Sequence, residues 1–307
     1  MIWHKPYGMK EGFLIGGGLI VAGLMLQLSV GPVVWEAFRW PVNGILLAAL
    51  LCIIAIIFLL RRKVCGFLFI GTYKAAIPAL VYAVALTIVM GLTRQTVDGD
   101  WLNNMLSFWP FVLIYVYIDV ILGQIIIRRI INCQLSARLC RLARPRIVNL
   151  KRDIPFLLNH LGLFLAMTTA TLGNADMQRL KMITVKGETE WRAMDQQGMI
   201  VEMPIAIGLK AFIMETYDDG SPRRFASEIQ ILTKSGKNIE TTVDVNKPVE
   251  VDGWKIYQYG YDTQMGAMSQ TSILELVSDP WLPLVYTGIY MMLAGAVCML
   301  LFGSRKK

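Results

Sequence analysis

Six long apolar runs divide the sequence, and they constrain the fold more than any other feature. They cover residues 13–30, 45–60, 74–92, 105–127, 154–173 and 282–302. A helix needs about 20 apolar residues to cross the hydrocarbon core of a bilayer, and each run comes close to that length. Only 17% of the residues are charged, against about 25% in an ordinary soluble domain. The sequence therefore predicts a polytopic α-helical membrane protein with about six spans.

Basic residues are distributed unevenly between the loops. Sixteen lie in the two termini, after the second run, and between the fourth and fifth runs at 128–153. The intervening short loops hold only Arg39 and Arg94. Because short cytoplasmic loops are rich in Lys and Arg, we expect both termini in the cytoplasm and residues 174–281 outside. The same distribution explains the net charge of +8 without nucleic-acid binding.

Residues 174–281 lack long apolar runs and contain 16 acidic against 11 basic residues. Segments 225–231 and 255–261 alternate with a period near two, which is typical of strands, and turn residues occupy 218–222 and 235–237. We expect an inserted all-β, sandwich-like extracytoplasmic domain of about 100 residues. The aromatic cluster at 254–261 is interpreted as the packed face of a strand, the alternative being a site for a planar ligand or a peptide.

The predicted organisation has four parts. Residues 1–63 form an N-terminal two-span hairpin, 64–173 a three-span core with the basic loop 128–153, 174–281 the β-rich domain, and 282–307 the last span with a basic tail. The five cysteines include none in the β-rich segment, and neither CxxC nor CxxCH occurs. A disulfide framework, a thioredoxin-like site and covalently attached haem are therefore not expected. Cys133 and Cys140 are interpreted as ordinary thiols of the basic loop.

Ionisable side chains within spans are costly and are candidate sites. His160 is one of two histidines and lies inside the fifth run, whereas His4 is in the N-terminal segment. Its imidazole is suited to a haem-iron ligand or a proton relay, and equally to a hydrogen bond between helices. Asp119 lies at a similar depth in the fourth run. It is a candidate partner for the second imidazole nitrogen, unless tyrosine hydroxyls satisfy it or it is protonated. No catalytic constellation is apparent.

Several short motifs occur in a fixed order from residue 74 to 302. They are MGLTRQ at 90–95, SFWPF at 107–111, HLGL at 160–163, FASE at 225–228, VNKP at 245–248, GWKIYQ at 253–258, and DP at 279–280 before a final span with a basic tail. In this order, with a domain inserted before the last span, the sequence resembles the ResB family of system II cytochrome c biogenesis proteins. The first two runs are additional to the family pattern.

The resemblance implies a subunit of a cytochrome c synthase in the bacterial inner membrane. Its partners would be a Trp-rich CcsA-like membrane protein, apocytochrome c and haem b, which is held transiently and without a covalent bond. His160 matches the intramembrane histidine of the family and would be an axial ligand of the haem iron. The WGxxWxWD motif of the CcsA-like partner is absent from this chain, so we expect a subunit that is not catalytic alone.

Two other function classes remain open on the sequence. One is a scaffold that stabilises a CcsA-like partner without contacting haem, with His160 as an interhelical hydrogen bond. The other is a transporter or sensor that uses Asp119 and His160 as a proton relay, although inverted repeats are not apparent.

Overall fold

The computed structural model describes residues 7–96, 101–140, 150–219 and 221–302, with the side chains at 132–140, 150–152, 222 and 302 left undescribed. His4, the basic residues between 141 and 149, and the side chains of Cys133 and Cys140 therefore lie outside the described part. The chain divides into two compact units, Met1–Asp176 with Trp281–Lys307, and Met177–Pro280. They are called here the helical unit and the β-domain.

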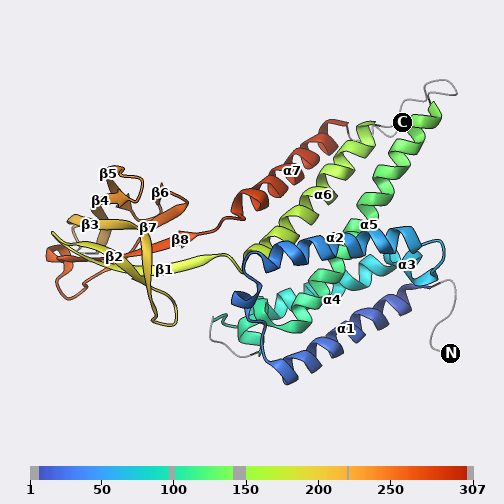
Figure 1. Ribbon diagram of the computed structural model, residues 1–307, viewed down its shortest axis with the longest axis horizontal. Coiled ribbons are helices and arrows are strands. Elements are labelled where there is room, and N and C mark those ends of the chain that lie inside the picture. Colours follow the sequence, from blue (N-terminus) through green and yellow to red (C-terminus); the bar gives the residue numbers. More distant parts are fainter. Residues whose placement is uncertain (1–6, 97–100, 141–149, 220, 303–307) are drawn as a thin grey trace. The chain divides into compact units, whose positions relative to one another are not determined.

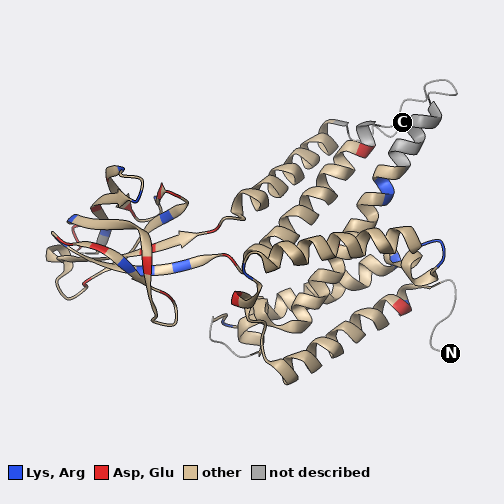
Figure 2. Ribbon diagram, viewed as in Figure 1, with Lys and Arg blue, Asp and Glu red and all other residues tan. Residues whose placement is uncertain are grey.

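The helical unit contains six helices that are long and apolar enough to cross a membrane, within the described residues (Figure 1). They are α1 (Met9–Val30), α2 (Val42–Leu60), α4 (Tyr73–Leu92), α5 (Trp109–Cys140), α6 (Leu150–Gly173) and α7 (Leu282–Phe302). Figure 2 shows these helices almost free of charged residues, whereas charged residues are spread over the β-domain. The predicted multi-pass membrane protein with an inserted β-rich domain is confirmed.

Helix α5 is the centre of the bundle and packs against α1, α2, α4 and α6. Glycines allow α1 to approach closely: a Cβ atom built on Gly12 would lie 2.5 Å from the Lys74 carbonyl oxygen, and one on Gly23 would lie 2.6 Å from the Pro110 nitrogen. On α2, the Ile54 carbonyl oxygen accepts a 2.6 Å hydrogen bond from Nε2 of Gln124, which is fully buried in α5. Small residues and such polar contacts bind helices together where the hydrophobic effect is absent.

Within the described part of the chain, α6 and α7 form the most extensive contact between two helices. Gly162 of α6 and Gly288 of α7 face each other, and a Cβ atom built on either glycine would lie 2.6 Å from the carbonyl oxygen of the other. Gly295 similarly faces Asn159, whose side-chain amide donates a 2.8 Å hydrogen bond to the Pro155 carbonyl. The two backbones can be this close at Gly162 and Gly288 only because neither residue has a side chain.

Three short helical elements that the sequence does not predict lie between the spans. They are η1 (Trp35–Phe38), α3 (Cys65–Ile70) and η2 (Trp101–Ser107). The apolar run in α3 is too short for a span and carries no period, so its composition predicts neither a helix nor a strand. Phe69 of α3 is nevertheless buried in the hydrophobic core that α4 and α5 form.

A polar cluster around Asp176 joins three distant segments of the helical unit. Its Oδ1 accepts a 2.8 Å hydrogen bond from the Trp40 backbone N–H, and its Oδ2 accepts 2.8 and 2.6 Å bonds from the Asn43 amide and the Trp281 indole. Asn43, fully buried, also donates to the Leu172 carbonyl. Burial acts to raise the pKa of the Asp176 carboxyl, but these donors and the Arg39 charge together lower it below its ordinary value.

The β-domain is one continuous antiparallel sheet in the order β5-β4-β3-β2-β1-β8-β7-β6. Its strands are β1 (Gln178–Val185), β2 (Thr189–Met194), β3 (Ile200–Thr216), β4 (Pro222–Thr233), β5 (Asn238–Asp244), β6 (Val249–Val251), β7 (Trp254–Tyr261) and β8 (Thr271–Ser278). Strands β4 and β7 contain the two predicted alternating segments. The domain is all-β as predicted, but the expected sandwich-like arrangement is replaced by a single curled sheet. The sheet is continuous because the first half of the long strand β3 pairs with β2 and its second half pairs with β4.

The curled sheet encloses one hydrophobic core. It contains Met182, Ile207, Ile231, Ile256 and Leu274, all fully buried. One end of the interior is polar: the Ser227 hydroxyl donates a 2.7 Å bond to the Ser272 hydroxyl, which also bonds the Gln258 amide at 3.0 Å. Because these buried groups satisfy one another, they fix the packing at that end at little cost.

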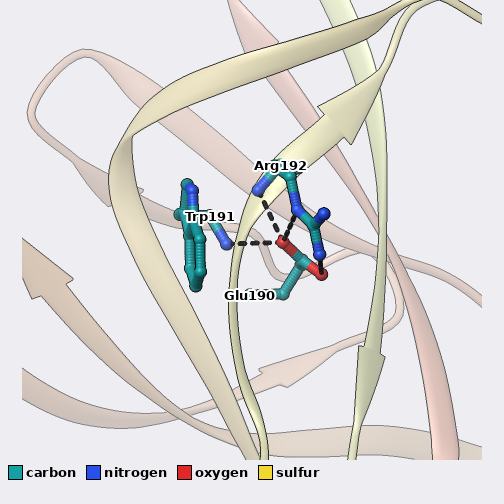
Figure 3. A network of polar contacts seen from close by, with 3 residues as sticks. All are labelled: Glu190, Trp191 and Arg192. Carbon is teal, nitrogen blue, oxygen red and sulfur yellow. Dashed lines mark hydrogen bonds and ion pairs between the residues drawn. The ribbon is translucent and has the colours of Figure 1, made fainter.

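The Glu190 carboxylate accepts hydrogen bonds from backbone N–H groups where the pairing of β2 with β3 is irregular. The β2–β3 register shifts between Glu190 and Arg192. At this point Oε1 of Glu190 accepts bonds of 3.0 and 2.9 Å from the Trp191 and Arg192 backbone N–H groups, and also pairs with the Arg192 guanidinium (Figure 3). The Arg192 hydrogen bond is the main cause that lowers the pKa of Glu190 to about 2.

Glu190→Ala is expected to loosen β2 locally and to cost about 1 kcal/mol of β-domain stability, a small value because the ion pair is solvated. Hydrogen exchange at residues 191 and 192 should become faster, while exchange in β8 stays unchanged. Since the pKa of Glu190 is lowered in the folded state, its contribution is present above pH 4.5 and is lost as pH falls toward 2. Glu250→Ala, at an exposed position on β6, is the control; equal exchange in both variants would contradict the assignment.

Candidate functional site

The candidate site lies on one face of α6. Phe156, His160, Phe164 and Thr168 follow one another at intervals of four residues, so they form a stripe along the helix. Phe164 packs against the hydrophobic core of the helical unit, to which α5 contributes Ile118 and Ile121, and this directs the stripe toward the side of α6 that α5 covers. Gly162, on another face, contacts α7. The helix thus binds α7 with one face and presents its histidine on the face directed at α5.

The imidazole of His160 is oriented by the preceding helical turn. Its Nδ1 lies 2.9 Å from the Phe156 carbonyl oxygen. A carbonyl oxygen only accepts hydrogen bonds, so this contact assigns the proton of the neutral ring to Nδ1 and leaves the lone pair on Nε2. The ring also stacks on the Phe156 ring, with centroids 3.9 Å apart and planes 22° from parallel. Such a histidine is pre-oriented to ligate a metal through Nε2.

The Phe156 ring also contacts a cation. The guanidinium carbon of Arg129, on α5, lies 4.9 Å from the Phe156 ring centroid. Arg129 forms an ion pair with Asp153, one turn before Phe156 on α6. An arginine, an aromatic ring and an imidazole therefore occupy successive positions at the α5–α6 contact. In the sequence, Arg129 is indistinguishable from the other basic residues of the loop 128–153. Phe156 has one available signal, which is its position one helical turn before His160.

Asp119 is buried at another level of the α5–α6 contact. It is 4% exposed and lies beside Thr168, which is 2% exposed. Among the described residues, Oδ1 of Asp119 and Oγ1 of Thr168 have no hydrogen-bond partner. Thr168 is eight residues from His160, about 12 Å along the helix. The hydrogen bond described for Nδ1 of His160 goes to the helix backbone, and a supporting role of Asp119 toward His160 stays a prediction.

The aromatic cluster of β7 is a strand with two different faces. Trp254, Ile256 and Gln258 are buried in the β-domain. Tyr259 is exposed and lies under the Lys181 ammonium at 3.9 Å, and Tyr261 stacks on Phe212 at 4.8 Å. These contacts agree with the packing interpretation of the cluster.

The part of the chain that contains this stripe is similar to a known protein family. A family model described as ResB-like matches residues 151–273, from α6 into β8. Residues 151–273 are therefore similar to the ResB-like family. This confirms the resemblance predicted from the sequence, with a match that begins at α6 rather than at residue 74. The ResB-like segment holds His160 and Phe156 together with most of the β-domain.

Two further proteins are similar to the chain. A cytochrome c biogenesis protein CcsB of Prochlorococcus marinus subsp. pastoris is 28% identical over 116 residues, which cover 38% of this chain and 26% of the relative. The chain thus matches about a quarter of that protein's length. A solved structure of the cytochrome c haem lyase CcmF aligns with 96% of this chain and 46% of its own, at 14% identity and a TM-score of 0.39. That score is too low to establish a shared fold.

Proposed function

We propose that this chain is a membrane subunit of a cytochrome c haem-attachment complex, with haem as its cargo. The observation that carries the proposal is the orientation of His160 inside the ResB-like segment, with Nδ1 hydrogen-bonded to the helix backbone and the Nε2 lone pair available. The name of the curated relative, a cytochrome c biogenesis protein, supports the same process.

In this proposal His160 is an axial ligand of haem b during passage through the membrane. The backbone hydrogen bond holds the imidazole in the tautomer that ligates through Nε2, so the ring loses little freedom when it binds iron. Phe156 and Phe164 supply apolar surface on either side of the histidine for a flat macrocycle. The chain's contribution is to bind and position haem, while a Trp-rich CcsA-like partner attaches it to the cysteines of apocytochrome c.

The proposed location is the bacterial inner membrane, with both termini in the cytoplasm and the β-domain outside. The excess of Lys and Arg in alternate loops supports this orientation. The β-domain then faces the compartment in which c-type cytochromes mature, where it would hold apocytochrome c or brace the partner.

His160→Ala is expected to lower the haem content of the chain purified with its partner by at least about tenfold, because the iron loses its ligand on this chain. Absorption spectra of the reduced and oxidised complexes measure this content. Leu161→Ala, a neighbouring substitution at a more exposed position, is the control and should retain haem.

Added imidazole should restore the haem spectrum of His160→Ala, which a purely structural histidine would not allow. Equal haem in wild type and His160→Ala would move the ligand to the partner. If wild type and His160→Ala each purify as an intact complex with the partner but neither contains haem, the proposal is contradicted and the scaffold function is favoured.

A further inference from the structure

Arg129 has hydrogen-bonding capacity that the described structure does not use. Its guanidinium pairs with Asp153 through Nη2. Its Nε, however, is buried and has no hydrogen-bond partner among the described residues. A buried donor without an acceptor costs free energy, so this position favours a further anionic or carbonyl oxygen.

The neighbouring Arg128 also has a buried Nε without a hydrogen-bond partner among the described residues, but both of its terminal nitrogens bond within the helical unit. Its Nη1 and Nη2 donate bonds of 2.8 and 2.9 Å to the carbonyl oxygens of Gly71 and Leu68. A Cβ atom on Gly71 would lie 2.5 Å from its guanidinium carbon. Arg128 therefore closes the end of α3, and Arg129 is the arginine that remains directed at α6.

The separation of Arg129 from His160 suits a ligand with a metal at its centre and carboxylates at its edge. Both contact Phe156, whose ring centroid is 3.9 Å from the imidazole centroid and 4.9 Å from the guanidinium carbon. The sum of these two distances is the largest possible separation between the guanidinium carbon and the imidazole centroid. This separation is shorter than a porphyrin with its side chains. A haem ligated by Nε2 of His160 can thus extend past Phe156 to Arg129.

We propose that Arg129 binds a propionate carboxylate of the haem held by His160, and that Asp153 occupies the guanidinium when haem is absent. The inference rests on the proposed function. The Arg129–Asp153 pair is largely buried, with side chains 26% and 15% exposed. A carboxylate bound there needs a cationic partner to offset its lost hydration, and the planar guanidinium binds carboxylates in two-point geometry. The Asp153 carboxylate stands in for the propionate with the same chemistry.

The exchange makes opposite predictions for the two partners of the ion pair. Arg129→Gln removes the propionate contact. Asp153→Asn removes the competitor and leaves Arg129 free for haem. If the pair served only to hold α5 against α6, both substitutions would loosen the same contact and act in the same direction.

The test titrates the full chain with its partner in lipid nanodiscs, using haemin and haemin dimethyl ester as probes. The ester retains the iron and the macrocycle but carries no propionate charge. Wild type is expected to bind haemin about tenfold more tightly than the ester, since a charge-assisted hydrogen bond is lost with the ester. Arg129→Gln is expected to abolish this preference by weakening haemin binding alone, and Asp153→Asn to bind haemin at least as tightly as wild type.

Each other outcome identifies what has failed. Equal weakening of haemin and ester by Arg129→Gln would overturn the propionate assignment and indicate a structural arginine or one bound to a lipid phosphate. Weaker haemin binding in Asp153→Asn would overturn the exchange. A third outcome is that His160→Ala loses haemin while wild type binds haemin and the ester equally well. This result would support the proposed function and contradict only the role of Arg129. Absence of haemin binding to the intact wild-type pair would remove the proposed function itself.

Discussion

Gly288→Leu is expected to separate α6 from α7 and to destabilise the helical unit by about 3 kcal/mol or more. A Cβ atom at this position already lies 2.6 Å from the Gly162 carbonyl oxygen and 2.7 Å from the Ala166 backbone nitrogen. These neighbours are helix backbone, so no rotamer change relieves the overlap and the two helices must move apart. The loss of contact should appear as a lower midpoint of thermal unfolding in detergent and as a lower level of the protein in membranes.

Gly18→Leu is the matched control. It is also a glycine in a predicted span, but a Cβ atom there meets nothing within 4 Å. Leucine has a higher helix propensity than glycine, so this variant should accumulate normally. Equal stability of Gly288→Leu and Gly18→Leu would show that α6 and α7 are not in the described contact.

Asp176→Ala is expected to cost the helical unit about 3 kcal/mol. Three donors from Trp40, Asn43 and Trp281 lose their acceptor at once, and hydrogen bonds to a charged group contribute about 1.5–3 kcal/mol each, although not additively. Thermal unfolding of the purified chain measures the loss. Asp176→Asn retains one carbonyl oxygen and should fall between alanine and wild type.

The same carboxylate predicts a pH dependence. Because the pKa of Asp176 is lower in the folded chain than its ordinary value, its contribution is complete near neutral pH and is lost as pH falls below about 4. The stability difference between wild type and Asp176→Asn should shrink over that acidic range. A constant difference from pH 7 to pH 3 would contradict an ionised Asp176 at the centre of the cluster.

Local patterns predicted most of the fold, since spans and alternating strands are written into consecutive residues. The Asp176 cluster was missed because its partners lie 105, 133 and 136 residues away in the sequence. The continuous curled sheet was missed for a related reason. Alternation within β3 predicts a strand, but not that its two parts pair with different neighbours.

The candidate site was predicted in part. His160 was found because an ionisable group is costly in a span. Arg129 was missed because its charge matched the rest of the basic loop, and only the fold brings it beside Phe156. Counting residues from the ends of the spans places Asp119 and His160 at similar depths in the membrane. This count carries no information about the direction in which each side chain points around its helix.

The pairing of the first strand of the β-domain with its last strand also constrains the order in which the protein assembles during synthesis. The first and last strands, β1 and β8, pair along their whole length, and the adjoining helices α6 and α7 pair through Gly162 and Gly288. About a hundred residues separate these helices, so at about 5–20 residues per second the ribosome needs about 5–20 s to make the intervening chain. During that interval α6 lies in the membrane with its glycine face open, and a chaperone or partner subunit has time to occupy it before α7 emerges.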